Sequence, residues 1–113
     1  MIEVVDGTGH SETIARISSD VTRWMTRLPE RIDQYRAHMP SFRNWLALVD
    51  GEPVGEGFCL EPPDMKESSA AFGEICVLPE ARRRGVGTAL FVEITAHARS
   101  LGKTDLEVVA FDD

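Results

Sequence analysis

Residues 74–90 constrain this 113-residue chain more than any other stretch. They read Glu-Ile-Cys-Val-Leu-Pro-Glu-Ala-Arg-Arg-Arg-Gly-Val-Gly-Thr-Ala-Leu. The largely apolar run over 71–78, bounded by serines on one side and Pro79 on the other, predicts a buried strand. After Gly87, apolar residues recur at helical spacing as far as Gly102, which predicts a helix of about four turns. The sequence therefore predicts a strand, a short turn and a glycine-containing helix start in direct succession.

Three arginines, Arg82, Arg83 and Arg84, crowd the start of this predicted helix. A helix start carries partial positive charge, so it disfavours cations and stabilises anions. An anion held by the main-chain N–H groups of residues 85–88 and by guanidinium groups would explain the arrangement. The two glycines in that range would let a phosphate approach the main chain closely. The alternative is a solvated basic turn whose glycines only ease the packing of helix on strand.

The same stretch contains the spaced motif Val77-x-Pro79-x-x-Arg82-x-x-Gly85-x-Gly87-x-x-Leu90. This motif resembles the acetyl-CoA-binding signature of the GCN5-related N-acetyltransferase (GNAT) superfamily, whose core is Gln/Arg-x-x-Gly-x-Gly/Ala, and every position of that core is filled. The resemblance implies an α/β (α+β) fold with a mixed, mainly antiparallel sheet flanked by helices.

The remaining segments fit that fold in the order β-α-α-β-β-β-α-β. Strands are expected over 2–5, 45–49, 54–60, 71–78 and 104–111, and helices from Ser11, from Pro29 to about His38, and after Gly87. The hairpin between the second and third strands is indicated by Asp-Gly-Glu-Pro at 50–53. Gly55 and Gly57 in the third strand indicate a bulge or a close approach of main chains.

The family normally continues with another helix and two strands, and it often has an asparagine after the fifth strand and a tyrosine on the following helix. Neither motif is present, so residues 1–113 are expected to be one C-terminally truncated GNAT-like domain. If the natural protein has this length, an exposed last strand would invite pairing with another chain, so we expect self-association through 104–111.

Composition limits the expected location of the protein and the classes of molecule that it binds. Hydrophobic residues make up 42% and charged residues 27% of the chain, without a membrane-length apolar run or an apolar N-terminal signal segment, so a cytoplasmic location is expected. The net charge of −7 argues against nucleic-acid binding. Cys59 and Cys76 are expected to be reduced core residues, and His10, His38 and His97 show no metal-ligand spacing.

The resemblance implies direct transfer of an acetyl group from the cosubstrate acetyl-CoA to a primary amine of a small molecule or peptide. Cofactor binding is expected at Cys76, Val77, Arg82, Arg83, Arg84, Gly85, Val86, Gly87 and Thr88. The pantetheine arm would pair with the main chain of the first two of these residues, and the pyrophosphate would lie on the turn and helix start. Main-chain N–H groups near Val77 would stabilise the developing oxyanion.

Glu74 is the candidate general base, directly or through a water, because it lies on the strand that leads to the motif. The alternatives are a solvated residue or a salt bridge. Cys76 is a weak candidate nucleophile, since no adjacent histidine lowers its pKa.

The sequence defines the binding site of the acceptor amine and the general acid less well. Trp24, Tyr35 and Met39 could shape the acceptor site, although such residues more often pack a core. No residue matches the family's usual acid, so a catalytically silent CoA-binding or structural module of a longer or tandem protein stays an alternative.

Overall fold

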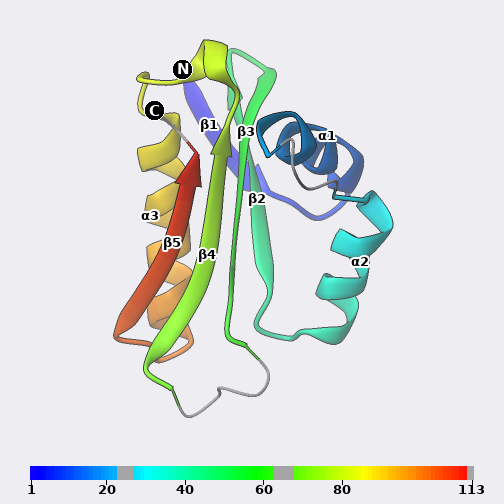
Figure 1. Ribbon diagram of the computed structural model, residues 1–113. Helices are drawn as coiled ribbons and strands as arrows, with labels where there is room; N and C mark the ends of the chain where they lie inside the picture. Colours follow the sequence, from blue (N-terminus) through cyan, green and yellow to red (C-terminus); the bar gives the residue numbers. More distant parts are fainter. Residues whose placement is uncertain (23–26, 63–67, 112–113) are drawn as a thin grey trace.

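A computed structural model of the protein describes residues 1–22, 27–62 and 68–111. Its elements are β1 (Ile2–Asp6), α1 (Ser11–Val21), α2 (Pro29–His38), β2 (Arg43–Val49), β3 (Glu52–Leu60), β4 (Ala70–Val77), a 3₁₀ turn (Pro79–Ala81), α3 (Val86–Ser100) and β5 (Asp105–Phe111). The strands of this described part form one sheet in chain order, with β1 to β4 antiparallel and β5 parallel to β4 (Figure 1). The predicted element order and mixed, mainly antiparallel sheet are confirmed.

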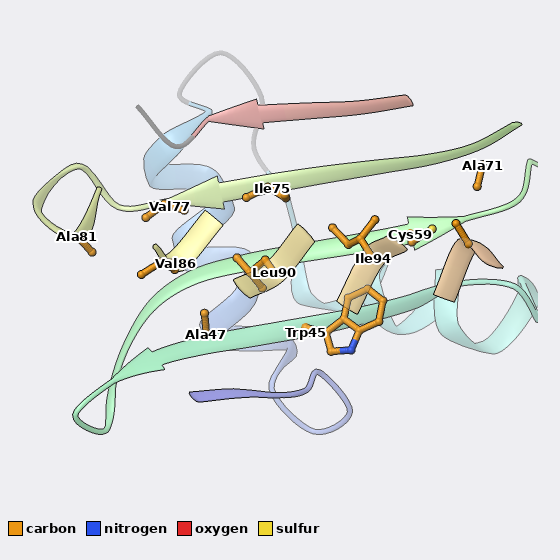
Figure 2. Packing of buried hydrophobic residues seen from close by; sticks show 11 residues of the cluster. Trp45, Ala47, Cys59, Ala71, Ile75, Val77, Ala81, Val86, Leu90 and Ile94 are labelled. Atoms are coloured by element: carbon orange, nitrogen blue, oxygen red, sulfur yellow. The ribbon is translucent and has the colours of Figure 1, made fainter. Parts of the chain in front are cut away.

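Helices cover both faces of this sheet. α3 lies along one face, and α1 and α2 lie on the other (Figure 1). Leu90 and Ile94 of α3 are fully buried against the sheet (Figure 2). Ile14 and Ile17 of α1 are buried on the opposite face with Leu46 of β2. Within the described ranges, no helix combines the length and apolar character needed to cross a membrane.

Glycines of β3 allow α3 to lie close to the sheet. A Cβ added at Gly55 would come within 3.0 Å of Val86 Cγ1, and one at Gly57 within 3.2 Å of Ile94 Cδ1. The register between β2 and β3 also shifts within the strand pair. The register shift agrees with the predicted bulge, and the close approach is that of α3 side chains rather than of a main chain. Because α3 begins at Val86, this packing fixes the position of the helix start relative to the strands.

The β2–β3 hairpin turns in two residues. Asp50 has φ 51° and Gly51 has φ 84°, the two positive values that a type I′ turn requires. Val49 consequently pairs with Glu52, and β3 begins two residues earlier than the predicted Val54. The right-handed twist of the two strands favours this tight turn over the expected four-residue connection.

Replacing Gly51 by alanine is expected to lower the free energy of unfolding by about 1 kcal/mol, because an L side chain is strained at this φ. No heavy atom lies within 4 Å of the added Cβ, so the cost is conformational rather than steric. Gly51→Asn is the control, since asparagine tolerates the left-handed region. Urea unfolding measures both variants, and equal stability of Gly51→Ala and the parent would contradict the turn assignment.

The carboxyl ends of the parallel strands β4 and β5 lie side by side, next to the turn that leads into α3 (Figure 1). β5 is an edge strand, and Val109 on it is exposed. Pairing of this edge with another chain stays a prediction.

Candidate functional site

The junction between β4 and α3 forms a helix start that no side chain caps. Gly85 occupies the N-cap position in the left-handed conformation, with φ 89°, and α3 begins at Val86 rather than after Gly87 as predicted. The first N–H groups of a helix have no partner inside the helix. Gly85 offers no side-chain oxygen to them, and the first turn of α3 carries no acidic residue. This helix start can therefore accept hydrogen bonds from an external anion.

The three arginines of this junction do not share one role. Arg82 Nε donates a hydrogen bond to the carbonyl oxygen of Val77 at 2.9 Å, so Arg82 fastens the turn to the end of β4. Arg83 and Arg84 are exposed beside the helix start. Arg83 has φ 63°, a conformation that costs an ordinary residue on the order of 1 kcal/mol. The junction thus accepts a main-chain conformation of some cost at Arg83.

A groove extends from this junction along α3. It has a volume of about 310 Å³. It is lined by Ile75, Gly87, Thr88, Phe91, Val108 and Ala110. Two of the predicted cofactor residues therefore line a mainly apolar hollow between α3 and β5. Val86 is buried against Gly55, so only its main chain is available to a ligand.

At the end of β4, successive residues direct their main-chain N–H and C=O groups alternately toward β3 and toward β5. The carbonyl oxygen of Cys76 lies 3.2 Å from the Cβ position of Gly55, on the β3 side. The main chain of Val77 is directed to the opposite side by the alternation of the strand. The last β4–β5 pair joins Cys76 and Phe111, so Val77 lies just beyond it. Of the two residues predicted to pair with pantetheine, Val77 is therefore the one that directs its main chain away from β3.

Glu74 lies on the sheet face that α1 and α2 cover, and it forms a salt bridge. Its Oε2 lies 2.6 Å from Arg27 Nη1, with side chains 11% and 15% exposed. The Arg27 guanidinium also lies 5.6 Å from the ring centre of Phe58, at cation–π distance. Burial lowers the pKa of Arg27, but the bond to Glu74 and the nearby carboxylates raise it overall. Glu74 therefore belongs to a salt bridge, and its role as a general base stays a prediction.

A second carboxyl group, which the sequence interpretation missed, lies beside Glu74. Glu56 of β3 is 1% exposed, and its Oε1 has no hydrogen-bond partner within the described part of the chain. Burial, followed by the charge of Glu74, raises the pKa of Glu56 to about 8. Glu56 is therefore mostly neutral at pH 7. The only signal in the sequence was an acidic residue between two glycines of an apolar strand; Arg27 gave no signal.

Cys76 completes this cluster. Glu56, Glu74 and Cys76 each place one ligand-type atom within 4.8 Å of the others. Burial, and then the two carboxyl groups, strongly raise the pKa of the Cys76 thiol, which argues against Cys76 as a nucleophile. Such a trio could coordinate a metal ion, and residue spacing could not reveal it because its members lie on two strands. Arg27 already supplies one positive charge, so a single proton is enough to neutralise the remaining negative charge of the two carboxyl groups.

Aromatic residues lie next to the cluster. Tyr35, Phe42 and Phe58 form a row of tilted rings, with 5.9 Å between the centres of each neighbouring pair. They line, with Glu56, a cavity of about 10 Å³, which has room for about one water molecule. Tyr35 lies on the sheet face where the acceptor site is predicted, and Met39 packs into the core on this face; a part for either residue in acceptor binding stays a prediction. Trp24 lies outside the described residues.

Comparisons with known proteins agree with this geometry. The family model described as the acetyltransferase (GNAT) family matches residues 12–113. A search among curated proteins found no significant match.

Solved structures of acetyltransferases share the fold. The chain is similar to a ribosomal-protein-alanine N-acetyltransferase from Brucella melitensis biovar Abortus 2308 (18% identity, TM-score 0.65), over 97% of this chain and 79% of the other. A putative acetyl transferase from Pyrococcus furiosus is 19% identical with a TM-score of 0.71, over 96% and 81% of the two chains. A phosphinothricin acetyltransferase from Sinorhizobium meliloti in complex with AcCoA is 16% identical with a TM-score of 0.72, over 88% and 60%.

Proposed function

Since the chain belongs to the acetyltransferase (GNAT) family, we propose that it binds acetyl-CoA and transfers the acetyl group to a primary amine by direct attack. The observation that carries this proposal is the start of α3. Gly85 leaves that start without a side-chain cap, and exposed arginines lie beside it. A diphosphate would satisfy both the N–H groups and the cations.

Each residue of the junction has a proposed part in binding. The N–H groups of Gly85, Val86, Gly87 and Thr88 would hold the pyrophosphate, together with Arg83 and Arg84. Arg82 would keep the turn in shape through its bond to the Val77 carbonyl. The groove between α3 and β5 would take the apolar part of the cosubstrate. When bound, acetyl-CoA supplies a thioester carbonyl, and the main-chain N–H of Val77 would stabilise the negative charge that develops on its oxygen.

A base is needed because the amine must lose a proton. A lysine-like amine has a reference pKa near 10.4, so fewer than about one in a thousand are neutral at pH 7. Glu74 would accept the proton. It lies three residues before Val77, about 10 Å along the strand, so a bridging water is required. The acceptor would enter from the side of α1 and α2, where Tyr35 and Phe58 lie. A small molecule or a peptide could supply the amine.

A second candidate is a catalytically silent module that binds CoA. The salt bridge between Glu74 and Arg27 favours it, because that bond occupies one oxygen of the proposed base. Release of free thiol from acetyl-CoA, dependent on an added amine, separates the two candidates. Binding without any such release would favour the silent module.

Acetyl-CoA is expected to raise the melting temperature of the protein by several degrees. At a ligand concentration of 100-fold Kd, binding adds about 2.7 kcal/mol of stability. Arg84→Glu and Gly87→Asp should both abolish the shift, since each adds negative charge beside the pyrophosphate. Thermal unfolding with and without acetyl-CoA measures the effect.

The matched control is Arg99→Glu, which makes the same charge change at an exposed position near the other end of α3. It should keep the full shift. An unchanged melting temperature of the parent protein at millimolar acetyl-CoA would reject CoA binding. A shift that survives in Arg84→Glu and Gly87→Asp would place the ligand elsewhere.

A further inference from the structure

Two carboxyl groups and one guanidinium group meet on the sheet face opposite α3. Glu56 and Glu74 each place an oxygen within 4.8 Å of the other, and Arg27 bonds to Glu74 at 2.6 Å. If both carboxyl groups were ionised, this nearly water-free cluster would carry a net charge of −1, with like charges in close contact. Low dielectric makes such an arrangement unfavourable, so one proton is expected to stay in the cluster.

The surroundings decide which residue holds that proton. Arg27 Nη1 lies 2.6 Å from Glu74 Oε2, so the guanidinium charge is paired with Glu74 rather than with Glu56. Glu56 is more deeply buried, and its Oε1 has no hydrogen-bond partner among the described residues. Burial and the charge of Glu74 raise the pKa of Glu56 to about 8. The proton therefore resides on Glu56.

The other titratable groups that face Glu56 do not compete for this role. Cys76 from β4 keeps its own proton, since burial and the two carboxyl groups raise its thiol pKa. Tyr35 from α2 faces Glu56 across the small cavity. The charged residues of α1, Glu12, Arg16 and Asp20, are exposed and point away from the sheet. The proton is therefore shared between Glu56 and Glu74, with Arg27 as the neighbouring cation.

We propose that Glu56 and Glu74 act as one acid–base unit that holds a single proton, in which Glu74 exchanges protons with the acceptor amine through a water and Glu56 stores the proton. This inference rests on the proposed acetyl transfer. It assigns to the Glu56–Glu74 unit the acid function for which the sequence offers no tyrosine in a matching position. Glu56 is a positioning residue, because it acts through its neighbour.

Protons are conserved over one catalytic turnover. The amine nitrogen forms a bond to the acetyl carbon, and the carbon–sulfur bond breaks. Glu74 takes one proton from the neutral amine nitrogen through the bridging water, and the leaving thiolate then receives one proton from Glu74. Glu56 exchanges its stored proton with Glu74 and ends the turnover protonated, which restores the starting state. The unit gains one proton and loses one, so the products are the amide and the free thiol and the charge of the protein is unchanged; the proton that an ammonium substrate loses to become the neutral amine goes to solvent.

The first test needs no acceptor. In protein labelled with ¹³C at the glutamate carboxyl carbons, one carbon is expected to titrate near pH 8, and this signal should disappear in Glu56→Gln. In Glu74→Gln the same carbon should titrate about one unit lower or more, a tenfold loss of proton affinity, because the like charge is gone. Glu52→Gln, at an exposed position of the same strand, should change neither the presence of this signal nor its titration midpoint. A midpoint for Glu56 that is unaffected by Glu74→Gln would overturn proton sharing.

The second test uses activity. Thiol release from acetyl-CoA is measured from about pH 6 to about pH 9 with a panel of primary amines: a peptide N-terminus, a lysine side chain, a polyamine and an aminoglycoside. Glu56→Gln should lower kcat by about 100-fold and remove the inflection near pH 8, while the acetyl-CoA-induced melting shift is kept. Glu52→Gln should match the parent.

The outcomes separate this inference from the proposed function. A pH profile and kcat in Glu56→Gln that equal those of the parent would overturn the acid–base role of Glu56 and leave acetyl transfer standing. A parent protein that binds acetyl-CoA but releases no thiol with any amine would overturn both the proposed reaction and the catalytic use of the pair. The carboxyl titration would still report whether the two residues share a proton.

Discussion

Raising the pH from about 5 to about 8 is expected to lower the free energy of unfolding of this protein by about 1.4 kcal/mol for each pH unit. The cause is Glu56, whose pKa burial and the charge of Glu74 raise from its ordinary value of 4.5 to about 8. Between these two values the folded protein holds a proton on Glu56 and the unfolded chain does not. The unfolded state then binds fewer protons than the folded state, so the unfolded fraction of the protein grows as the pH rises.

Other shifted groups act outside this window. The pKa values of Asp6 and Asp50 are lowered, by hydrogen bonds from Thr8 and from the N-terminal amine respectively. Their contribution to stability is present above their ordinary value of 3.8 and is lost as the pH falls below it. Burial raises the thiol pKa of Cys59 to about 11 and that of Cys76 further, so both destabilise the fold only at alkaline pH. The slope between about 5 and 8 therefore reports on Glu56.

Urea unfolding at constant ionic strength across this range measures the slope. Glu56→Gln should remove most of it, because glutamine keeps the shape without the titrating proton. Glu52→Gln removes a carboxyl group from an exposed position of the same strand and should leave the slope intact. A parent protein whose stability is flat over this range, or a slope that survives in Glu56→Gln, would contradict a proton held on Glu56.

The parts of the fold that were predictable depend on neighbours in the sequence. Asp50 and Gly51 specify a turn whose positive φ values are a property of two adjacent residues. The strand, turn and helix start around Gly85 and Gly87 also follow from local chemistry. Errors there are small shifts of boundaries, since tertiary packing decides the end residues. α3 begins at Val86, which is buried against Gly55 of another strand.

The cluster that could carry the acid–base chemistry was only half predictable. Glu74 stood out because it precedes the motif on the same strand. Arg27 lies 47 residues away from it, and Glu56 reaches it only through the pairing of β3 with β4. The antiparallel register places Glu56 opposite Cys76, so three separated residues meet on one sheet face. Periodicity reveals which positions are buried, but the partners of a buried charge depend on the three-dimensional register.

Replacing Arg27 by methionine is expected to destabilise the protein by about 3 kcal/mol at pH 7, because it leaves Glu74 ionised without a cation in a mostly buried site. The matched control is Arg43→Met. Arg43 pairs with Asp6 at 3.1 Å, with side chains 50% and 43% exposed, and should lose no more than about 1 kcal/mol. Urea unfolding compares the two variants.

The shared proton predicts an asymmetry between the two ends of the Arg27–Glu74 bond. Glu74→Gln should cost less than Arg27→Met, because Glu56 can then release its proton and supply a carboxylate for Arg27 within the same cluster. The double variant Arg27→Met/Glu74→Gln should recover at least half of the loss caused by Arg27→Met, since no charge is left unpaired. An ordinary isolated salt bridge would instead make both single variants similarly costly. Equal losses in Arg27→Met and Glu74→Gln would therefore indicate that Glu56 does not respond to its neighbour.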